Sequence, residues 1–387
     1  DCYRSFKRRR AVPLIKTSGL GGSVKAREAM LWTAVFQAGG HSGTIIWQSN
    51  AMVDLEKPAL PLKKEAVELG QVFAGLRGGV PKLLQQARED SSTVAVHYSQ
   101  ASINADFITS VPGRWRSVAA SEPQRFPAYQ CREAWWKLLE DRGLRPLFVS
   151  SAQVEAGDLV NRGFKVFVLP RSIALSDAES AGIRKFVEQG GTLVADGFVG
   201  RMDEHCRERE AGVLDEFLGI RRLEHDGYHS SEQMASLDWD APAEKRPKWG
   251  GGKNRAECAF IEECIEPLPG VRALGCTEYS DNLLGIVREH GTGRTVLMNC
   301  SPTEYLDARR SGSGGAGYQA FFGEIFDRAG LKPELEVCRP GDGARLPGWG
   351  VFGFTHGRAR YFGVAPDLAA TQDTLGAIRV EGEGKVG

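Results

Sequence analysis

The chain has 387 residues, 42% of them hydrophobic and 25% charged, which is the composition of an ordinary globular protein with two or three domains. Lysine plus arginine and aspartate plus glutamate number 49 each, so the net charge gives no general attraction for nucleic acid or an anionic membrane surface. Since no apolar run approaches the roughly 20 residues of a membrane-spanning helix, we expect neither nucleic acid nor a membrane as a partner.

Residues 1–90 predict the order strand, helix, strand, loop, helix. Short apolar runs at 12–15 and 43–47 indicate the strands, and apolar residues at helical spacing indicate helices at 24–38 and about 62–76. A segment of this size cannot close a barrel or bury both faces of a sheet by itself. We therefore interpret residues 1–90 as the C-terminal remnant of a β/α barrel.

The central part of the chain is organised around residues 164–197, which predict a strand, a helix and a second strand. Ser176 and Glu179 form a capping box, so the helix should begin at Asp177. Gly190-Gly191 supplies a left-handed stop before the second strand. Two strands joined by a crossover helix of this length form a right-handed βαβ unit, and such strands are parallel.

Strand and helix signals alternate on both sides of this unit, over a central domain at residues 91–332. Further strands are expected at 93–98, 146–149, 284–287 and 295–299, and further helices at 129–141, 213–218 and 318–329. Residues 222–257 are polar and rich in Gly, Pro, Asp and Glu, which is typical of a long surface excursion. The alternation predicts an α/β fold with a doubly wound, flavodoxin-like parallel sheet.

Residues 333–387 change to short strands, expected at 335–337, 350–354 and 359–364. The last two meet at Thr355-His356-Gly357, which is a hairpin signal. We expect the start of an antiparallel β-domain that the sequence does not complete.

Motifs for catalysis or cofactor binding are missing from the expected turns. A glutamine amidotransferase site needs a Cys nucleophile on a tight turn after a strand. The turns after the two central strands read Pro170-Arg171-Ser172-Ile173 and Asp196-Gly197-Phe198, without a Cys. Gly19-x-Gly21-Gly22 lacks the spacing of a nucleotide-binding motif. The sequence therefore predicts no catalytic residue and no cofactor.

The segment around the excursion holds several metal-ligand and aromatic residue types. Gly227 and polar flanks favour a solvated loop over a zinc helix for the possible metal ligands, which are His205, Cys206, His225 and His229. Trp239 and Trp249 are either anchors for the long loop or a sugar-stacking patch, and anchoring is favoured. The eight cysteines form no C-x-x-C pair, which favours reduced thiols, no metal site and a cytoplasmic location.

Trp47, Gln48 and Asn50 follow the expected strand at 43–47. If this is the last strand of a β/α barrel, these residues lie at the C-terminal face, where barrels hold their active sites. Trp47 can stack on a sugar ring while Gln48 and Asn50 hydrogen-bond hydroxyl groups. The alternative is a Trp that closes the top of the barrel, and the sequence favours neither.

Three segments resemble the C-terminal half of glycoside hydrolase family 42 β-galactosidases. REAMLWTAVFQAGGHSGTIIWQSN at 27–50 is similar to the last helix and strand of their catalytic barrel. AVHYSQAS at 95–102 and FVLPRSIALSDAESAGIRKFVEQGGTLVADG at 167–197 look like their trimerisation domain, which has a class I glutamine amidotransferase-like fold without that chemistry. HGTGRTVLMNC at 290–300 and the strands after Pro333 look like the lead into their C-terminal β-domain.

The resemblance implies a carbohydrate substrate, a homotrimer and a retaining mechanism with two carboxylates. The nucleophilic Glu would lie near the end of the strand at 12–15, where the sequence reads Lys16-Thr17-Ser18, and no Asp or Glu lies between Asp1 and Glu28. No catalytic carboxylate is carried over, so we expect the chain alone to be inactive. The N-terminus does not have the pattern of a signal peptide. Since an initiator Met is missing, we expect either the distal part of a hydrolase whose chemistry lies upstream or a relative that has lost its nucleophile. The alternative is a non-catalytic oligomerisation or carbohydrate-binding module.

Overall fold

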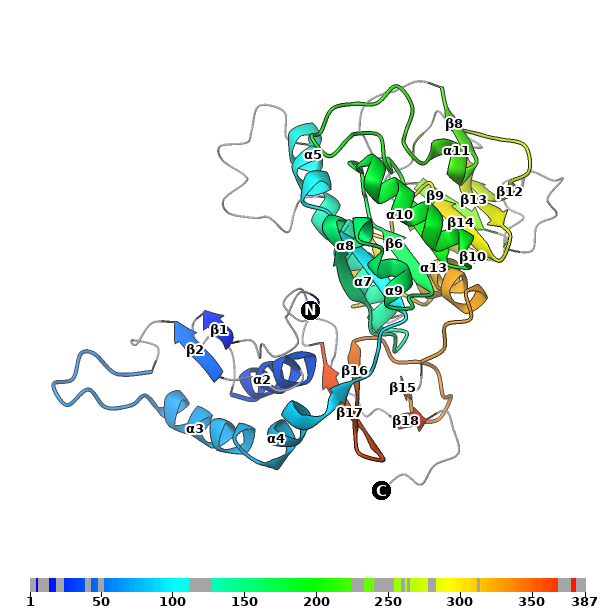
Figure 1. Cartoon of the computed structure of the whole chain (residues 1–387). Helices are drawn as coiled ribbons and strands as arrows, with labels where there is room; N and C mark the ends of the chain where they lie inside the picture. The colour runs from blue at the N-terminus through cyan, green and yellow to red at the C-terminus, as the bar shows by residue number, and fades with distance from the viewer. Residues whose placement is uncertain are drawn as a thin grey trace. The chain divides into compact units, whose positions relative to one another are not determined.

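The chain forms two compact units, Asp1–Ser91 with Glu334–Gly387 and Ser92–Pro333 (Figure 1). The computed structural model describes residues 5, 14–18, 24–38, 43–47, 52–110, 127–223, 233–237, 239, 254–258, 262, 265–277, 283–311, 314–333, 335–367 and 377–380. No described helix combines the length and the apolar character that a membrane crossing requires.

Among its described residues, the N-terminal part of the first unit contains a short parallel pair of strands and the helices α2, α3 and α4. Strands β1 (Leu14–Ser18) and β2 (Gly43–Trp47) are parallel and are joined through α2 (Val24–Ala38). Helices α3 (Lys64–Leu76) and α4 (Gly79–Gln86) follow. The predicted strand–helix–strand–helix order is confirmed, although β1 extends to Ser18 and α4 was not expected.

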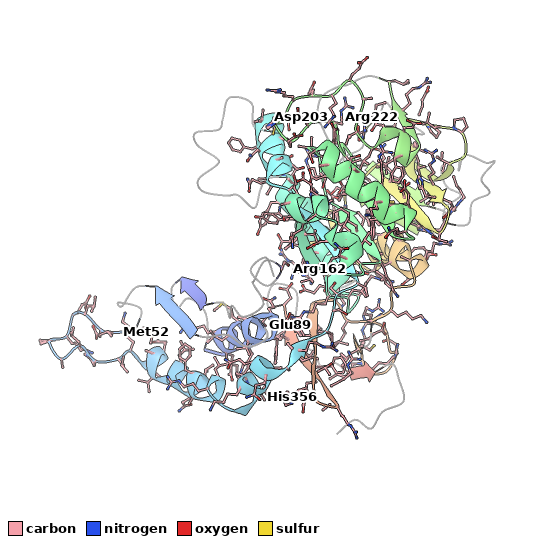
Figure 2. The ribbon with its side chains drawn as sticks, viewed as in Figure 1. Met52, Glu89, Arg162, Asp203, Arg222 and His356 are labelled. Carbon is pink, nitrogen blue, oxygen red and sulfur yellow. The ribbon has the colours of Figure 1, made fainter. Side chains whose placement is uncertain are left out.

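The C-terminal residues contribute strands to the same unit. Strands β16 (Trp349–His356) and β17 (Ala359–Pro366) form the predicted hairpin, in which His356 faces Ala359 across the turn (Figure 2). The short strand β3 (Arg88–Glu89) pairs with β16, and β15 (Leu335–Cys338) pairs with β18 (Ala377–Val380). One hydrophobic core joins the helices to the hairpin, and its buried members are Leu31, Val35, Leu69, Val72, Leu76, Leu84, Phe352, Phe354 and Ala365.

An arm precedes α3, formed by residues 52–63 folded back on themselves. Its two sides are joined by hydrogen bonds from Asp54 N–H to the Pro61 carbonyl and from Lys63 N–H to the Met52 carbonyl, both 2.9 Å long. Leu60 near its end has a φ of 46°, in the left-handed region. Its side chain is 53% exposed.

The second unit is built around one sheet of nine strands. In spatial order these are β10 (Asn254–Cys258), β9 (Gln233–Leu237), β12 (Arg272–Thr277), β13 (Leu283–His290), β14 (Gly293–Met298), β7 (Thr192–Asp196), β6 (Val166–Leu169), β4 (Val94–Tyr98) and β5 (Leu147–Ser150). The five strands from β14 to β5 are parallel, and the other four are antiparallel. Numbered as they occur in the chain, the parallel strands have the order 2-1-3-4-5.

The central βαβ unit has the geometry that the sequence predicts. Strands β6 and β7 are parallel, and α10 (Asp177–Glu188) connects them. Ser176 Oγ accepts a hydrogen bond from Glu179 N–H at 3.0 Å, and Glu179 Oε2 accepts one from Ser176 N–H at 2.8 Å. Gly190 has a φ of 98°, which ends the helix in the left-handed conformation. Gly191 acts differently, because a Cβ there would collide with the Phe186 ring.

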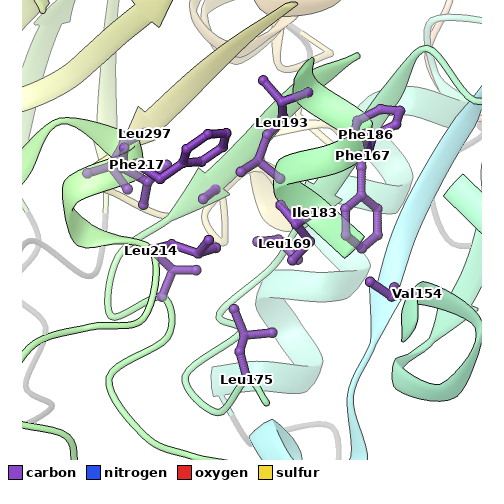
Figure 3. Close-up of a cluster of buried hydrophobic side chains, with 14 of the residues drawn as sticks. Val154, Phe167, Leu169, Leu175, Ile183, Phe186, Leu193, Leu214, Phe217 and Leu297 are labelled. Atoms are coloured by element: carbon purple, nitrogen blue, oxygen red, sulfur yellow. The ribbon is translucent and has the colours of Figure 1, made fainter. Parts of the chain in front are cut away.

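Helices cover both faces of the parallel strands (Figure 1). On one face α10 packs with α8 (Ser151–Glu155), α9 (Asp158–Asn161) and α11 (Asp215–Leu218), and the core contains Phe167, Leu169, Ile183, Phe186, Leu193 and Leu297 (Figure 3). Strands β6 and β7 are buried along their whole length. The helices α5 (Gln100–Ser110), α7 (Pro127–Glu140), α12 (Tyr305–Ala308) and α13 (Ala316–Arg328) complete the unit.

Two expectations for this unit were wrong. The expected surface excursion at 222–257 contains β9 and β10, which extend the sheet beyond β12. These strands are short and polar, so no apolar periodicity indicates them. Helix α5 was also missed, because Gln100, Ser102 and Asn104 break its apolar pattern. A small antiparallel ribbon of β8 (Ile220–Arg222) and β11 (Ile265–Pro267) was not expected either.

Candidate functional site

The predicted sugar-binding residues follow strand β2. Trp47 is the last residue of this strand and pairs with Ser18 at the end of β1, so its backbone lies at the carboxyl end of two parallel strands. Gln48 and Asn50 lie outside the described residues. The carbohydrate contact of all three residues stays a prediction.

The second unit brings together a Ser, a His and a Glu at the carboxyl ends of its parallel strands. His97 lies on β4, Ser172 on the turn after β6, and Glu179 in the first turn of α10. His97 Nδ1 lies 2.9 Å from Ser172 Oγ, and His97 Nε2 lies 3.0 Å from Glu179 Oε1. The order of contacts, hydroxyl to imidazole to carboxylate, is that of a catalytic triad.

The Glu179 carboxylate orients the His97 ring in this group. Burial by itself would raise the pKa of Glu179, but hydrogen bonds from His97, Ser176 and Ser151 and the charge of His97 lower that pKa below its usual value. The ionised carboxylate accepts a hydrogen bond from His97 Nε2–H, and Nδ1 of the same ring faces the Ser172 hydroxyl. The capping residue of α10 therefore also fixes the imidazole.

The residue before Ser172 has the backbone conformation of a strained strand-to-helix turn. Arg171 has a φ of 39°, which is unfavourable for a residue with a side chain. Its Nε donates to Asp106 Oδ1 on α5, its N–H donates to Asp196 Oδ1, and its guanidinium lies 5.1 Å from the centre of the Phe198 ring. These contacts hold Arg171 in the turn after β6, between the end of that strand and α10.

Asp196, at the end of β7, is a buried acceptor for three donors. Cys131 Sγ–H and Trp135 Nε1–H donate to its Oδ2 at 2.7 and 2.9 Å, and Arg171 N–H donates to Oδ1. Burial raises the pKa of Asp196 to about 6 because desolvation outweighs these hydrogen bonds. Burial also raises the pKa of the Cys131 thiol, and the charge of Asp196 adds to that effect, so Cys131 is not an activated nucleophile.

A second ionic network closes the edge beyond β7. Arg222 on β8, labelled in Figure 2, donates to both oxygens of Glu262 at 2.8 and 3.0 Å and pairs with Asp215. Glu262 also accepts the Phe198 N–H, and its own N–H donates to Asn299 Oδ1 at 2.8 Å. Burial opposes ionisation of Glu262, but the charge of Arg222 dominates and lowers the pKa of Glu262.

The edge of the sheet where open α/β folds bind ligands is therefore filled by its own side chains. Ser172, His97 and Glu179 are each no more than 2% exposed. A substrate does not reach a hydroxyl at that depth without movement of the helices around it. The arrangement supports packing and positioning of the strand ends rather than acyl transfer.

The other motifs of the sequence are structural or lie outside the described residues. Trp239 is buried and its Nε1–H donates to the Phe321 carbonyl at 3.4 Å, which favours the anchoring role. His205 is exposed, and Cys206 Sγ–H donates to the Ala101 carbonyl at 3.5 Å. Within the described ranges no three His, Cys, Asp or Glu side chains are grouped to hold a metal ion. His225, His229 and Trp249 lie outside those ranges.

Sequence reasoning identified Glu179 only as a cap and treated Ser172 and Arg171 as a turn without a Cys. His97 was one residue of a strand. His97 is 75 positions from Ser172 and 82 positions from Glu179 in the sequence. They meet because β4 pairs with β6. A His inside an otherwise apolar strand was the one local signal available.

The chain thus combines a mixed α/β scaffold with a closed sheet edge, a β-α-β fragment and a β-hairpin. No family model matches the chain, and no curated protein matches it by sequence. Solved structures do match. The β-galactosidase from Bacillus circulans sp. alkalophilus has 17% identity and a TM-score of 0.58, over 86% of this chain and 45% of that chain.

Two further structures show the same likeness. Gan42B, a GH42 β-galactosidase from G. stearothermophilus, has 15% identity and a TM-score of 0.60, over 88% of this chain and 45% of its own. α-L-Fucosidase isoenzyme 2 from Paenibacillus thiaminolyticus has 12% identity and a TM-score of 0.53, over 88% of this chain and 47% of its own. This chain thus has the fold of a part of the GH42 β-galactosidases and spans less than half of their length.

Proposed function

We propose that this chain is the C-terminal part of a β-galactosidase-like glycoside hydrolase that acts on a carbohydrate. The proposal rests on the structural match to GH42 β-galactosidases, which covers 86–88% of this chain and 45% of those chains. The parallel β1-α2-β2 fragment supports the end of a β/α barrel, because two parallel strands are not a stable sheet by themselves. The hairpin β16–β17 supports the start of a β-domain.

The 92–333 unit is proposed as a flavodoxin-like, class I glutamine amidotransferase-like domain for trimerisation. Its strand order 2-1-3-4-5 is the flavodoxin order. Arg171 at the turn after β6, held by Asp106 and Asp196, supports a domain without amidotransferase chemistry. Sedimentation velocity of the longer protein and of this chain tests the role, because a trimer is expected for both. A monomer at micromolar concentration would contradict it.

The chain alone is expected to hydrolyse nothing, because the segment before Glu28 has no acidic residue after Asp1. The test compares this chain with the longer polypeptide that contains the rest of the barrel, using a chromogenic galactoside. Activity of the longer protein alone agrees with the proposal. Turnover by this chain, or none by either protein, contradicts it.

A non-catalytic carbohydrate-binding module is the second candidate. The position of Trp47 at the carboxyl end of β2 favours it, since sugars stack on Trp rings at such sites. Calorimetry with galactose and lactose tests it by comparing the wild type with Trp47→Ala. Equal heats for the two proteins would remove this candidate. Independently of these two candidates, we propose a cytoplasmic location for the protein.

A further inference from the structure

Arg132 on helix α7 lies on a group of aromatic rings beside the edge strand of the nine-stranded sheet. Its guanidinium carbon is 4.6 Å from the centre of the Tyr98 ring, 5.4 Å from Tyr129 and 5.9 Å from Phe148. Trp136, one turn further along α7, packs on Phe148 with ring centres 4.3 Å apart. We call these five residues the Arg132 cluster.

The cluster lies at the carboxyl ends of two parallel strands. Tyr98 is the last residue of β4 and pairs with Ser150, the last residue of the edge strand β5. Tyr129 is 42% exposed, so one side of the cluster is open to solvent. The cluster lies at the same end of the sheet as His97 and Arg171, which are buried, whereas Tyr129 leaves this part open.

Two donors of the cluster have no acceptor among the described residues. The Arg132 guanidinium contacts rings but makes no hydrogen bond or ion pair with any of them. The Trp136 Nε1–H is buried, with 5% of the residue exposed, and has no hydrogen-bond partner. By contrast, Arg222 and Arg309 each hold a carboxylate through two nitrogen atoms. A buried donor without a partner, such as Trp136 Nε1–H, is uncommon and points to a missing acceptor, and the half-buried Arg132 guanidinium lies on the same Phe148 ring.

The geometry favours one class of acceptor. The Arg132 guanidinium carries a planar fork of N–H groups, and that fork matches the two oxygens of a carboxylate. Residues 132 and 136 are four positions apart on the same side of the helix, and both side chains lie on the Phe148 ring. One positive charge balances a carboxylate but not a phosphate dianion, and the rings offer an apolar surface to an organic body.

We propose that the Arg132 cluster is a binding site for a carboxylate group. The Arg132 fork takes the two carboxylate oxygens, and the Trp136 N–H is a further donor at the same site. The carboxylate comes either from a free organic acid or from an acidic side chain of a second copy of this chain. Such a site exists whether or not the chain is part of a glycoside hydrolase.

The test is a titration of the ¹⁵N-labelled full chain with sodium acetate and sodium benzoate, with sodium chloride at equal ionic strength as the reference. The observable is the Trp136 indole N–H signal, assigned with Trp136→Phe. A saturable shift is expected with both acids, with affinity about tenfold weaker or lost in Arg132→Gln. Inorganic phosphate should bind at least about tenfold more weakly than benzoate.

Arg162→Gln is the matched control. Arg162 lies 5.0 Å from the Phe164 ring, but its guanidinium already faces Asp158 at 3.9 Å. This variant should bind both acids like the wild type. A wild-type chain without a saturable Trp136 shift, or an Arg132→Gln chain with an equal shift, overturns the proposal. Circular dichroism of each variant confirms that it is folded.

Sedimentation velocity distinguishes the two sources of the carboxylate. If Arg132→Gln and added acetate both lower the association state, the site holds an acidic side chain of a second copy. If neither changes the association state while acetate still binds the wild type, the site holds a free organic acid. If the Arg162→Gln control also loses the trimer, that result bears on the proposed assembly role and not on the carboxylate site. The acetate titration then decides whether the site exists.

Discussion

Asp196 couples the stability of the second unit to pH. Its pKa is raised to about 6 in the fold by burial, from an ordinary value of 3.8. Folding therefore favours the protonated form, and this contribution is present below about pH 4 and is lost as the pH rises through 6. The difference corresponds to about 3 kcal/mol, from 1.36 kcal/mol per pKa unit. Urea unfolding between pH 4 and 7 measures it.

Asp196→Asn should flatten that pH dependence. It should also cost about 1–3 kcal/mol at low pH, because one amide oxygen does not accept all the bonds from Cys131, Trp135 and Arg171. Asp307→Asn is the control, since the Asp307 side chain is 94% exposed. An unchanged slope in Asp196→Asn would show that another group titrates.

Glu179→Gln tests the buried Ser–His–Glu group. The pKa of Glu179 is lowered in the fold, so its stabilising contribution is present above pH 4.5 and is lost as the pH falls through the folded value. We expect a loss of about 1–3 kcal/mol at pH 7, because a neutral amide replaces an ionised acceptor for His97. Glu188→Gln, at the exposed end of the same helix, should be neutral. Equal urea midpoints for wild type and Glu179→Gln contradict a structural role.

The residues of this group show how far local patterns reach. The capping box predicts Glu179 because Ser176 and Glu179 are three positions apart and meet within one helical turn. His97 and Ser172 meet only after β4 and β6 pair, so no local spacing indicates them. Arg171 is likewise an ordinary turn residue in the sequence, and its left-handed φ is a product of the fold.

At the scale of elements, the 52–63 arm carries an apolar side chain on an unfavourable backbone. Leu60 has a φ of 46° and is exposed, so its side chain gives little burial in exchange for the strain. Leu60→Gly should therefore raise the stability of the first unit by up to about 1 kcal/mol, after the extra entropy of glycine in the unfolded chain is subtracted. Thermal unfolding followed by circular dichroism measures it.

Leu62→Gly is the matched control for the arm. Leu62 is exposed like Leu60 but is not among the described residues with a positive φ. Glycine there should lower the stability slightly, by a few tenths to about 1 kcal/mol. A Leu60→Gly chain that is less stable than the wild type would show that the Leu60 side chain has a stabilising contact.

Elements with strong local signals were predicted, and elements that depend on pairing were not. The helices at 24–38 and 177–188 and the strands of the central βαβ unit have apolar periods, caps or glycine stops that act within a few residues. Strands β9 and β10 have neither an apolar alternation nor a turn signal, and they are strands because β12 offers an edge. Polar sequence therefore hid the two outermost strands on the antiparallel side of the sheet.

At the scale of the whole chain, one unit is a single continuous segment of the sequence and the other is formed by two separate segments. Residues 92–333 hold all the members of the core around β6, β7 and α10. The core of the other unit joins Leu31, Val35 and Leu69 to Phe352 and Phe354, which lie more than 280 positions later in the sequence. We expect residues 92–333, expressed alone, to unfold cooperatively with the urea midpoint that they have in the full chain.

Residues 1–91 alone should not unfold cooperatively, because β16 and β17 contribute the buried residues Phe352, Phe354 and Ala365 to their core. Joining residues 1–91 to 334–387 through a flexible linker of about 15 Gly and Ser residues should restore a cooperative transition, since such a linker spans about 20 Å. Phe354 is fully buried in that core. Phe354→Ala in the joined protein should remove about 3–5 kcal/mol and with it the transition. Cooperative unfolding of 1–91 by itself would show that the hairpin only covers a core that the helices complete without it.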